Sequence, residues 1–168
     1  MNMMEHLETR KCDVSLYLGI GYGPDVVCFP LYNFGLKRTG TCFYRPNGPK
    51  RVQNDVKGKY YTYISKGEVG VFGMESIEFS PTILLVSGIF KATALHRLGY
   101  TALHISSISP RNLKPQLQLL NRPYFAIGDN DAEGAQFARR YGGIQSPVDV
   151  DEMFDYEIER MVEGLIND

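Results

Sequence analysis

The pattern of apolar and polar residues changes near residue 80. Before that point, short runs rich in β-branched and aromatic residues are separated by glycine and proline turns, which is typical of antiparallel strands. The predicted strands cover residues 26–33, 41–45, 60–64 and 68–72. Pro30 suits an edge strand or the end of a strand. Residues 1–25 are poorly patterned, and we predict only a loop around the glycines of residues 19–23.

After residue 80, short apolar runs alternate with helical spacing. The predicted strands cover 82–86, 101–105, 124–127 and 144–147, and the predicted helices cover 90–98, 112–120, 132–141 and 151–166. Alternating strands and helices indicate a parallel sheet with helices on both faces. The sequence therefore predicts an α/β fold, with a small basic antiparallel β subdomain over 1–80 and the α/β domain over 81–168.

Polar residues follow the predicted parallel strands, where open α/β sheets bind ligands. They are Ser87-Gly88, Ser106-Ser107 and Asp129. Asp129 and Asp131 are two residues apart, so extended backbone would point both carboxylates the same way. Neighbouring carboxylates repel unless a cation lies between them, and Mg²⁺ or Mn²⁺ suits such ligands. The alternative is a strand-to-helix turn with Asp131 as the N-cap.

Length and composition set the broad class. A chain of 168 residues that is 43% hydrophobic fits one domain with a real core, and it has no apolar run long enough to span a membrane. Cys12, Cys28 and Cys42 form no Cys-x-x-Cys pair, which argues against a zinc site and a disulfide framework. No signal-peptide pattern is present, so we expect a cytoplasmic protein. No Walker A motif occurs, which argues against a fused helicase.

The net charge of −1 hides two opposite regions. Residues 36–66 hold eight lysines and arginines and one acid, a net charge of +7, with aromatic residues between them. Charges that meet phosphates and aromatics that stack on bases are typical of single-strand binding. The alternative is that these aromatics form the β core and the charges are solvated. Residues 125–168 carry a net charge of −8, and their last helix is either a solvated face or a docking surface.

The ordered motifs resemble the Toprim domain, specifically the catalytic core of DnaG-type primases. The resemblance covers roughly residues 26–155. An apolar strand followed by a helix over 83–99 lies where the first family motif belongs, and Asp129-x-Asp131-x-x-Gly134 matches the second. Asp149-x-Asp151 resembles the third. Upstream, residues 29–35, Arg45, Lys59-Tyr60 and 70–73 resemble the basic subdomain of these primases.

The first motif departs from the family. The family has an acidic residue where this chain has Ser87, and usually Asp where it has Lys91. Two negative charges are missing and one positive charge is gained. Lys91 can replace one metal ion electrostatically, and Ser87 can still contact phosphate; equally, the site can be inactive. Ser87 is otherwise a small residue at a tight turn, and Lys91 part of a solvated helix face.

The resemblance implies a compact primase-like protein of the kind found in bacteriophages, which would act in the host cytoplasm. It implies metal-dependent ribonucleotidyl transfer from nucleoside triphosphates on a single-stranded DNA template, with a replicative helicase or polymerase as a further partner. Mg²⁺ or Mn²⁺ would be held by Asp129 and Asp131, assisted by Asp149 and Asp151, while Ser87 and Lys91 complete the catalytic group. Template and triphosphate would be positioned by Lys37, Arg38, Arg45, Lys50, Arg51, Lys57 and Lys59.

Two alternatives remain open at this stage. A catalytically inactive Toprim-derived module would bind DNA or a replisome partner without chemistry, and Ser87 is the feature that favours it. A Toprim nuclease is disfavoured by the primase-like upstream segment. Of the histidines, His96 is interpreted as packing or surface, and His104 as a core histidine rather than a ligand.

Overall fold

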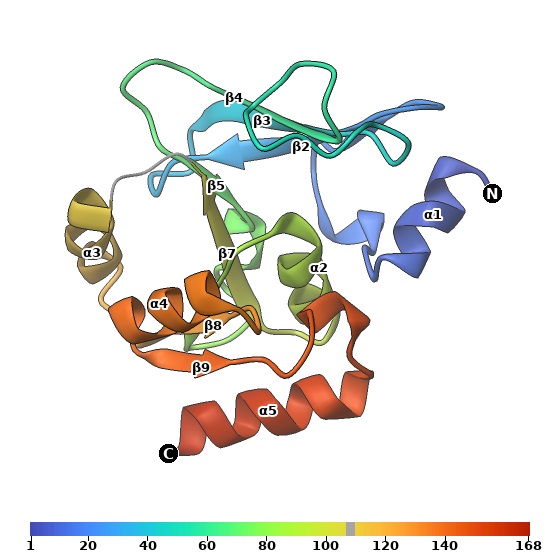
Figure 1. The fold of residues 1–168 in the computed structure, drawn as a ribbon. Helices are drawn as coiled ribbons and strands as arrows, with labels where there is room; N and C mark the ends of the chain where they lie inside the picture. Colours follow the sequence, from blue (N-terminus) through green and yellow to red (C-terminus); the bar gives the residue numbers. More distant parts are fainter. Residues whose placement is uncertain (107–109) are drawn as a thin grey trace.

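A computed structural model describes residues 1–106 and 110–168, without the side chains of residues 110–112. One mixed sheet runs through the molecule (Figure 1). Its strands are β1 (Gly21–Tyr22), β2 (Val27–Tyr32), β3 (Arg38–Tyr44), β4 (Tyr60–Ile64), β5 (Gly70–Phe72), β6 (Ile83–Val86), β7 (Thr101–Ser106), β8 (Tyr124–Gly128) and β9 (Gly143–Gln145). The helices are α1 (Met3–Thr9), α2 (Ile89–Arg97), α3 (Pro110–Leu119), α4 (Ala132–Tyr141) and α5 (Asp155–Asn167), with short 3-10 turns η1 (Val14–Leu16), η2 (Met74–Ser76) and η3 (Val150–Glu152).

The strand order is β4-β3-β2-β5-β7-β6-β8-β9, with β1 paired to β2. Pairing is antiparallel from β4 to β7 and parallel from β7 to β9. The change of pattern near residue 80 therefore marks the change from antiparallel to parallel pairing along the chain. Hydrogen bonds between β5 and β7 nevertheless join both parts in one sheet, with Val71 opposite Ile105. The division into two domains at residue 80 stays a prediction.

Successive side chains of β6 point to opposite faces of the sheet, as the two-residue period of a strand requires. Leu84 and Val86 pack into a core with residues of α1, α2 and α5, whereas Ile83 and Leu85 pack into a second core with residues of α3 and α4. Burial on both faces explains why this strand reads as a continuous apolar run. The predicted α/β fold, with helices covering both faces of a parallel sheet, is confirmed.

The predicted strands and most helices are confirmed within one to three residues. The last helix begins at Asp155 rather than 151, because residues 150–152 form a separate 3-10 turn before it. Pro115 lies inside α3, beyond the first turn where the sequence would tolerate it.

Residues 1–25, which are poorly patterned in the sequence, contain regular structure, and the two-residue strand β1 lies within the loop predicted around residues 19–23. Helix α1 occupies residues 3–9 and is closed by a capping box, in which Asn2 and Glu5 bond to each other's backbone N–H. Leu7 of this helix is fully buried in the core beneath α2. The N-terminal segment therefore belongs to the folded unit.

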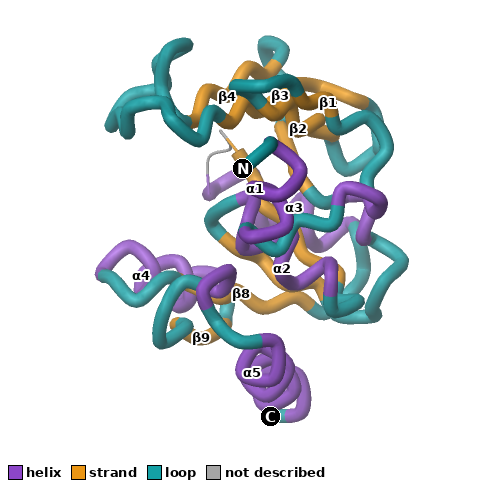
Figure 2. The backbone as a smooth tube through the Cα atoms, turned by 90° about the vertical axis from the view of Figure 1, so that its right-hand side faces the viewer, coloured by secondary structure: helices purple, strands orange, loops and turns teal. Residues whose placement is uncertain are grey.

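The basic loop between β3 and β4 and the acidic helix α5 lie at opposite ends of the molecule. The loop that joins β3 to β4 is at the top of Figure 1, and α5 lies at the bottom beside β9. Figure 2 shows α5 end-on, standing below the rest of the backbone. Within the described residues, the longest apolar helical stretches are too short to cross a membrane.

Candidate functional site

A cleft of about 870 Å³ opens at the carboxyl end of β6. Five segments form it: the end of α1, the strands and loop of the basic half, the β6–α2 turn with the first turn of α2, the end of β7 and the turn η3. Its charged residues are Arg10, Lys50, Lys59, Lys91, Asp149, Asp151 and Glu152. A basic wall from the N-terminal half thus faces an acidic wall from the C-terminal half, with the β6–α2 turn between them.

The β6–α2 turn carries Lys91 to the carboxylate of Asp129. The ammonium nitrogen lies 2.5 and 2.6 Å from the two carboxylate oxygens, and the Ser87 hydroxyl donates to one of them at 3.3 Å. The side chains of Lys91 and Asp129 are only 12% and 25% exposed. Asp149 lies 3.8 Å from the same ammonium group. A fixed cation therefore sits where two carboxylates approach each other, and the interpretation of Lys91 as a solvated side chain is wrong.

The Asp-x-Asp-x-x-Gly motif closes the turn between β8 and α4. Asp131 is the N-cap of α4, and its carboxylate accepts a 2.6 Å hydrogen bond from the backbone N–H of Gly134. A Cβ added to Gly134 would lie 1.9 Å from the carbonyl oxygen of Asp129, so only glycine fits this close approach. The N-cap alternative for Asp131 is confirmed.

Asp151 is held by Arg10, a residue that the sequence analysis missed. The guanidinium donates to the Asp151 carboxylate at 2.8 Å and lies 4.1 Å from the ring centroid of Phe90. It also donates to the hydroxyl of Tyr44 at 3.3 Å. The signal that could have found Arg10 is the Asn-x-x-Glu capping pattern at residues 2–5, since it predicts a helix that ends beside this arginine.

His104 lines the cleft at the carboxyl end of β7. Its Nδ1 lies 3.3 Å from the carbonyl oxygen of Val86, and burial, with a smaller contribution from the charge of Lys91, lowers its pKa to about 4. It is therefore neutral near pH 7. His96 is buried between the Tyr17 hydroxyl and the carbonyl of Ala102, which confirms its interpretation as a packing residue.

Only two of the seven predicted nucleic-acid-binding residues, Lys50 and Lys59, line the cleft. The other five lie elsewhere in the basic half: Lys37, Arg38, Arg45, Arg51 and Lys57. The aromatic residues of the basic half also differ from one another: Tyr44 is buried, whereas Tyr60 is exposed and lines the cleft. The alternative that the aromatics form the β core is thus correct for part of the set. Of the polar residues after β7, Ser107 lies outside the described residues.

Of the four predicted metal ligands, only Asp129 and Asp149 approach the same point, and the Lys91 ammonium group occupies it. Asp129 faces the Lys91 ammonium, Asp131 caps α4, and Asp151 is bound by Arg10. The described part of the chain contains no group of three or more His, Cys, Asp or Glu side chains able to hold one ion. These residues, as placed, do not fit a resident divalent cation, and the predicted Mg²⁺ or Mn²⁺ site stays a prediction.

Comparison of the sequence with models of protein families and with curated proteins gives no match. Comparison of the structure does. The Escherichia coli primase catalytic core superposes with a TM-score of 0.61 at 19% identity, covering 83% of this chain and 51% of that one. A DnaG catalytic core gives 0.68 at 16% identity, covering 96% and 72%. A DnaG primase catalytic domain bound to ssDNA gives 0.67 at 16% identity, covering 95% and 73%.

The chain has the Toprim-type fold of DnaG primase catalytic cores. It spans about half of the first of these proteins and about three quarters of the other two. The resemblance drawn from the motifs is therefore confirmed for the fold. In this Toprim-type fold, Ser87 and Lys91 stand at the end of the first parallel strand of the chain, and Lys91 fills the space beside Asp129 with its own charge.

Proposed function

We propose that this chain is a Toprim-fold protein that binds single-stranded DNA in the cleft without a divalent cation. The observation that carries the proposal is the ion pair between Lys91 and Asp129. The ammonium group of Lys91 neutralises the Asp129 carboxylate, so a phosphate can bind in the cleft without a metal ion to offset the repulsion from that carboxylate.

The walls of the cleft support the same conclusion. Lys50 and Lys59 bring two cations that no described acidic side chain pairs within 4 Å. Tyr60 offers an exposed ring beside them. Unpaired cations attract phosphates through counterion release, and an exposed ring can stack on a base of any sequence. One of the similar solved structures is a primase catalytic domain bound to ssDNA.

Binding of a labelled oligonucleotide across a salt series tests the proposal. We expect equal affinity in EDTA and in Mn²⁺, and a steep fall of affinity with salt. Lys50→Ala with Lys59→Ala should weaken binding about tenfold and reduce the salt slope by about two. The matched control, Lys57→Ala with Lys66→Ala, removes two cations that likewise have no described acidic partner but lie outside the cleft, and it should change binding little. Equal losses in both double variants, or no binding at low salt, would overturn the proposal.

Metal-dependent ribonucleotidyl transfer is the second candidate. The cleft favours it, because a basic wall for a triphosphate faces carboxylates across a space large enough for a nucleotide. A bound Mg²⁺ or Mn²⁺ would supply charge neutralisation at the transferred phosphate. In this chain Lys91 already neutralises Asp129, so we expect primer synthesis to be weak or absent.

A primer-synthesis assay with labelled nucleotides separates the two candidates. Ser87→Glu with Lys91→Asp restores the acidic pattern of the resembled family and should raise Mn²⁺ binding measured by calorimetry. Robust synthesis by the parent that Asp129→Asn abolishes would show that the chain is an enzyme. Intact DNA binding without synthesis in either the parent or the restored variant would support the binding protein.

A further inference from the structure

A second concave surface lies at the opposite end of the molecule from the basic half. A groove of about 880 Å³ runs between α5 and the strands β8 and β9. It has an apolar floor, lined by Phe125, Ile144, Met153, Tyr156, Met161 and Leu165. In the described part of the sheet β9 has a partner on one side only, β8. The groove therefore combines an exposed apolar surface with an open strand edge.

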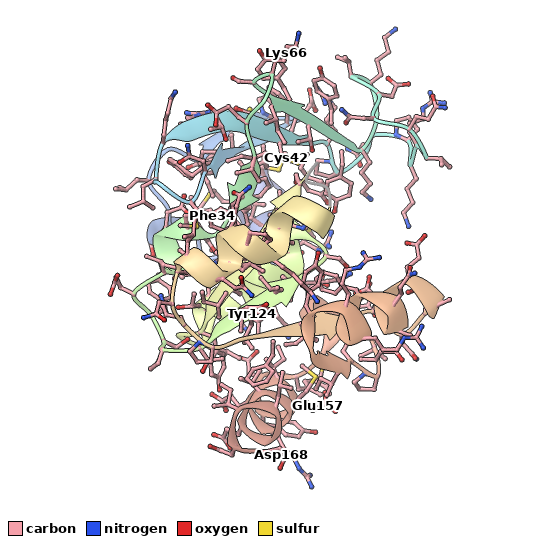
Figure 3. All side chains as sticks on the ribbon, turned by 90° about the vertical axis from the view of Figure 1, so that its left-hand side faces the viewer. Phe34, Cys42, Lys66, Tyr124, Glu157 and Asp168 are labelled. Carbon is pink, nitrogen blue, oxygen red and sulfur yellow. The ribbon has the colours of Figure 1, made fainter. Side chains whose placement is uncertain are left out.

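The helix that borders this groove is acidic. Residues 155–168 contain five acids and one arginine, a net charge of −4. Three charged residues of this segment, Glu157, Arg160 and Asp168, line the groove directly and together carry a net charge of −1. Figure 3 shows Glu157 on α5 and Asp168 at its end, on the side of the molecule away from Lys66. An occupant of the groove should therefore combine apolar side chains with positive charge.

The chain itself carries a segment of this kind. The loop between β3 and β4, residues 45–59, holds five basic residues and one acid, and without the two cleft lysines, Lys50 and Lys59, its net charge is +2. Two of its apolar side chains point into solvent: Val52 is fully exposed and Val56 is 58% exposed. Isolated valines on a charged loop gain by burial against another apolar surface.

We propose that this loop of one molecule docks into the groove beside α5 of a second copy. Loop and groove are at opposite ends of the molecule (Figure 1), so one copy cannot bury its own loop. The contact joins two different surfaces, which makes the assembly head-to-tail, and each added copy presents a fresh groove. The interface is partly electrostatic and should weaken as salt rises. It uses the valines and α5, not the lysines of the cleft.

Sedimentation velocity over a concentration series tests this directly. The parent should self-associate at low salt, about tenfold more weakly at 0.5 M than at about 0.05 M salt. Gly164 lines the groove, and a Cβ there meets no atom within 4 Å. Gly164→Arg should therefore fill the groove and repel the loop without disturbing the fold, and Gly164→Ala is the matched control that should still associate. Val52→Asp with Val56→Asp alters the loop instead of the groove and should also abolish association.

Mixing the two defective variants gives the sharpest result. The Gly164→Arg variant keeps an intact loop, and the Val52→Asp, Val56→Asp variant keeps an intact groove. Each alone should be monomeric, and an equal mixture should form a one-to-one dimer that grows no further. A monomeric parent, a mixture that stays monomeric, or association untouched by these substitutions would each overturn the proposal. Circular dichroism checks that both variants are folded, and unchanged DNA binding by Gly164→Arg separates this surface from the cleft.

Discussion

The two strand-to-helix turns at the carboxyl ends of β6 and β8 are neighbours in the sheet, yet they are closed in different ways. The β8–α4 turn is closed by its own residues, through the Asp131 cap and the close approach of Gly134. The β6–α2 turn has no side-chain cap, and the N-cap position of α2 is Gly88, whose φ is +155°. Instead, the ion pair between Lys91 and Asp129 links the β6–α2 turn to the β8–α4 turn.

At this edge of the sheet, one turn carries residues that stabilise the fold and the other carries residues that line the cleft. The Asp-x-Asp-x-x-Gly motif, which on sequence alone suggests chemistry, has a complete structural explanation at Asp131 and Gly134. The residues that line the cleft are instead Ser87 and Lys91, on the turn that departs from the resembled family. Substitutions in the two turns should therefore have different effects on stability and on binding.

The largest effect is expected at Gly134, and Gly88 is its comparison. Gly134→Ala should lower the free energy of unfolding by about 3 kcal/mol or more, because its Cβ would overlap the backbone of Asp129. Gly88→Ala should cost about 1–2 kcal/mol, since the nearest atoms are 3.5 Å away in the flexible Lys91 side chain and only the backbone conformation is strained. Urea unfolding measures both, and equal losses would contradict the distinction between the turns.

A smaller effect is expected from breaking the link between the turns. Lys91→Met should cost about 2 kcal/mol, because Asp129 is left half-buried with only the weak hydrogen bond from Ser87. Asp129→Asn in the same chain should recover part of that loss, as the uncompensated charge is removed. A double-mutant cycle by urea unfolding would measure a coupling of about 1 kcal/mol or more. Additive losses would mean that the ion pair does not hold the β6–α2 turn.

The smallest effect is expected at the cap. Asp131→Ala should cost about 1 kcal/mol, whereas Asp131→Asn should cost much less because asparagine also caps helices well. Neither should change binding of single-stranded DNA if the role of Asp131 is structural. Loss of DNA binding in the Asn variant, with stability retained, would instead assign Asp131 to the cleft.

Much of this fold follows from local sequence pattern. The strands β6 and β8 are buried on both faces and read as apolar runs, and α4 begins at an Asp and ends at a Gly, both strong local signals. The capping box of α1 is also local, yet the short helix lacks a long apolar period and was not predicted. The pairing of β5 with β7 could not be predicted, because antiparallel pairing across a change of pattern leaves no mark in either strand.

The site was predicted less completely than the fold. The sequence indicates that Asp129, Ser87 and Lys91 share an edge of the sheet, and the structure brings them within hydrogen-bonding distance. Sequence pattern alone does not indicate that Asp151 is bound by Arg10, which lies 141 residues earlier, because this contact depends on the fold of the whole chain. For the same reason the charge of the basic region did not reveal that only Lys50 and Lys59 would line the cleft.

The contact between the first and last segments also bears on the order of folding. Arg10 bonds Asp151, and Lys11 bonds the backbone of Met153 and lies near Asp155. Leu7 shares a core with Ile158 and Val162. During synthesis from the N-terminus, α1 must therefore wait until residues near 160 have emerged before it is fully buried. Contacts of such sequence separation slow folding, so the last step should be the docking of both chain segments together, leaving the cleft incomplete until then.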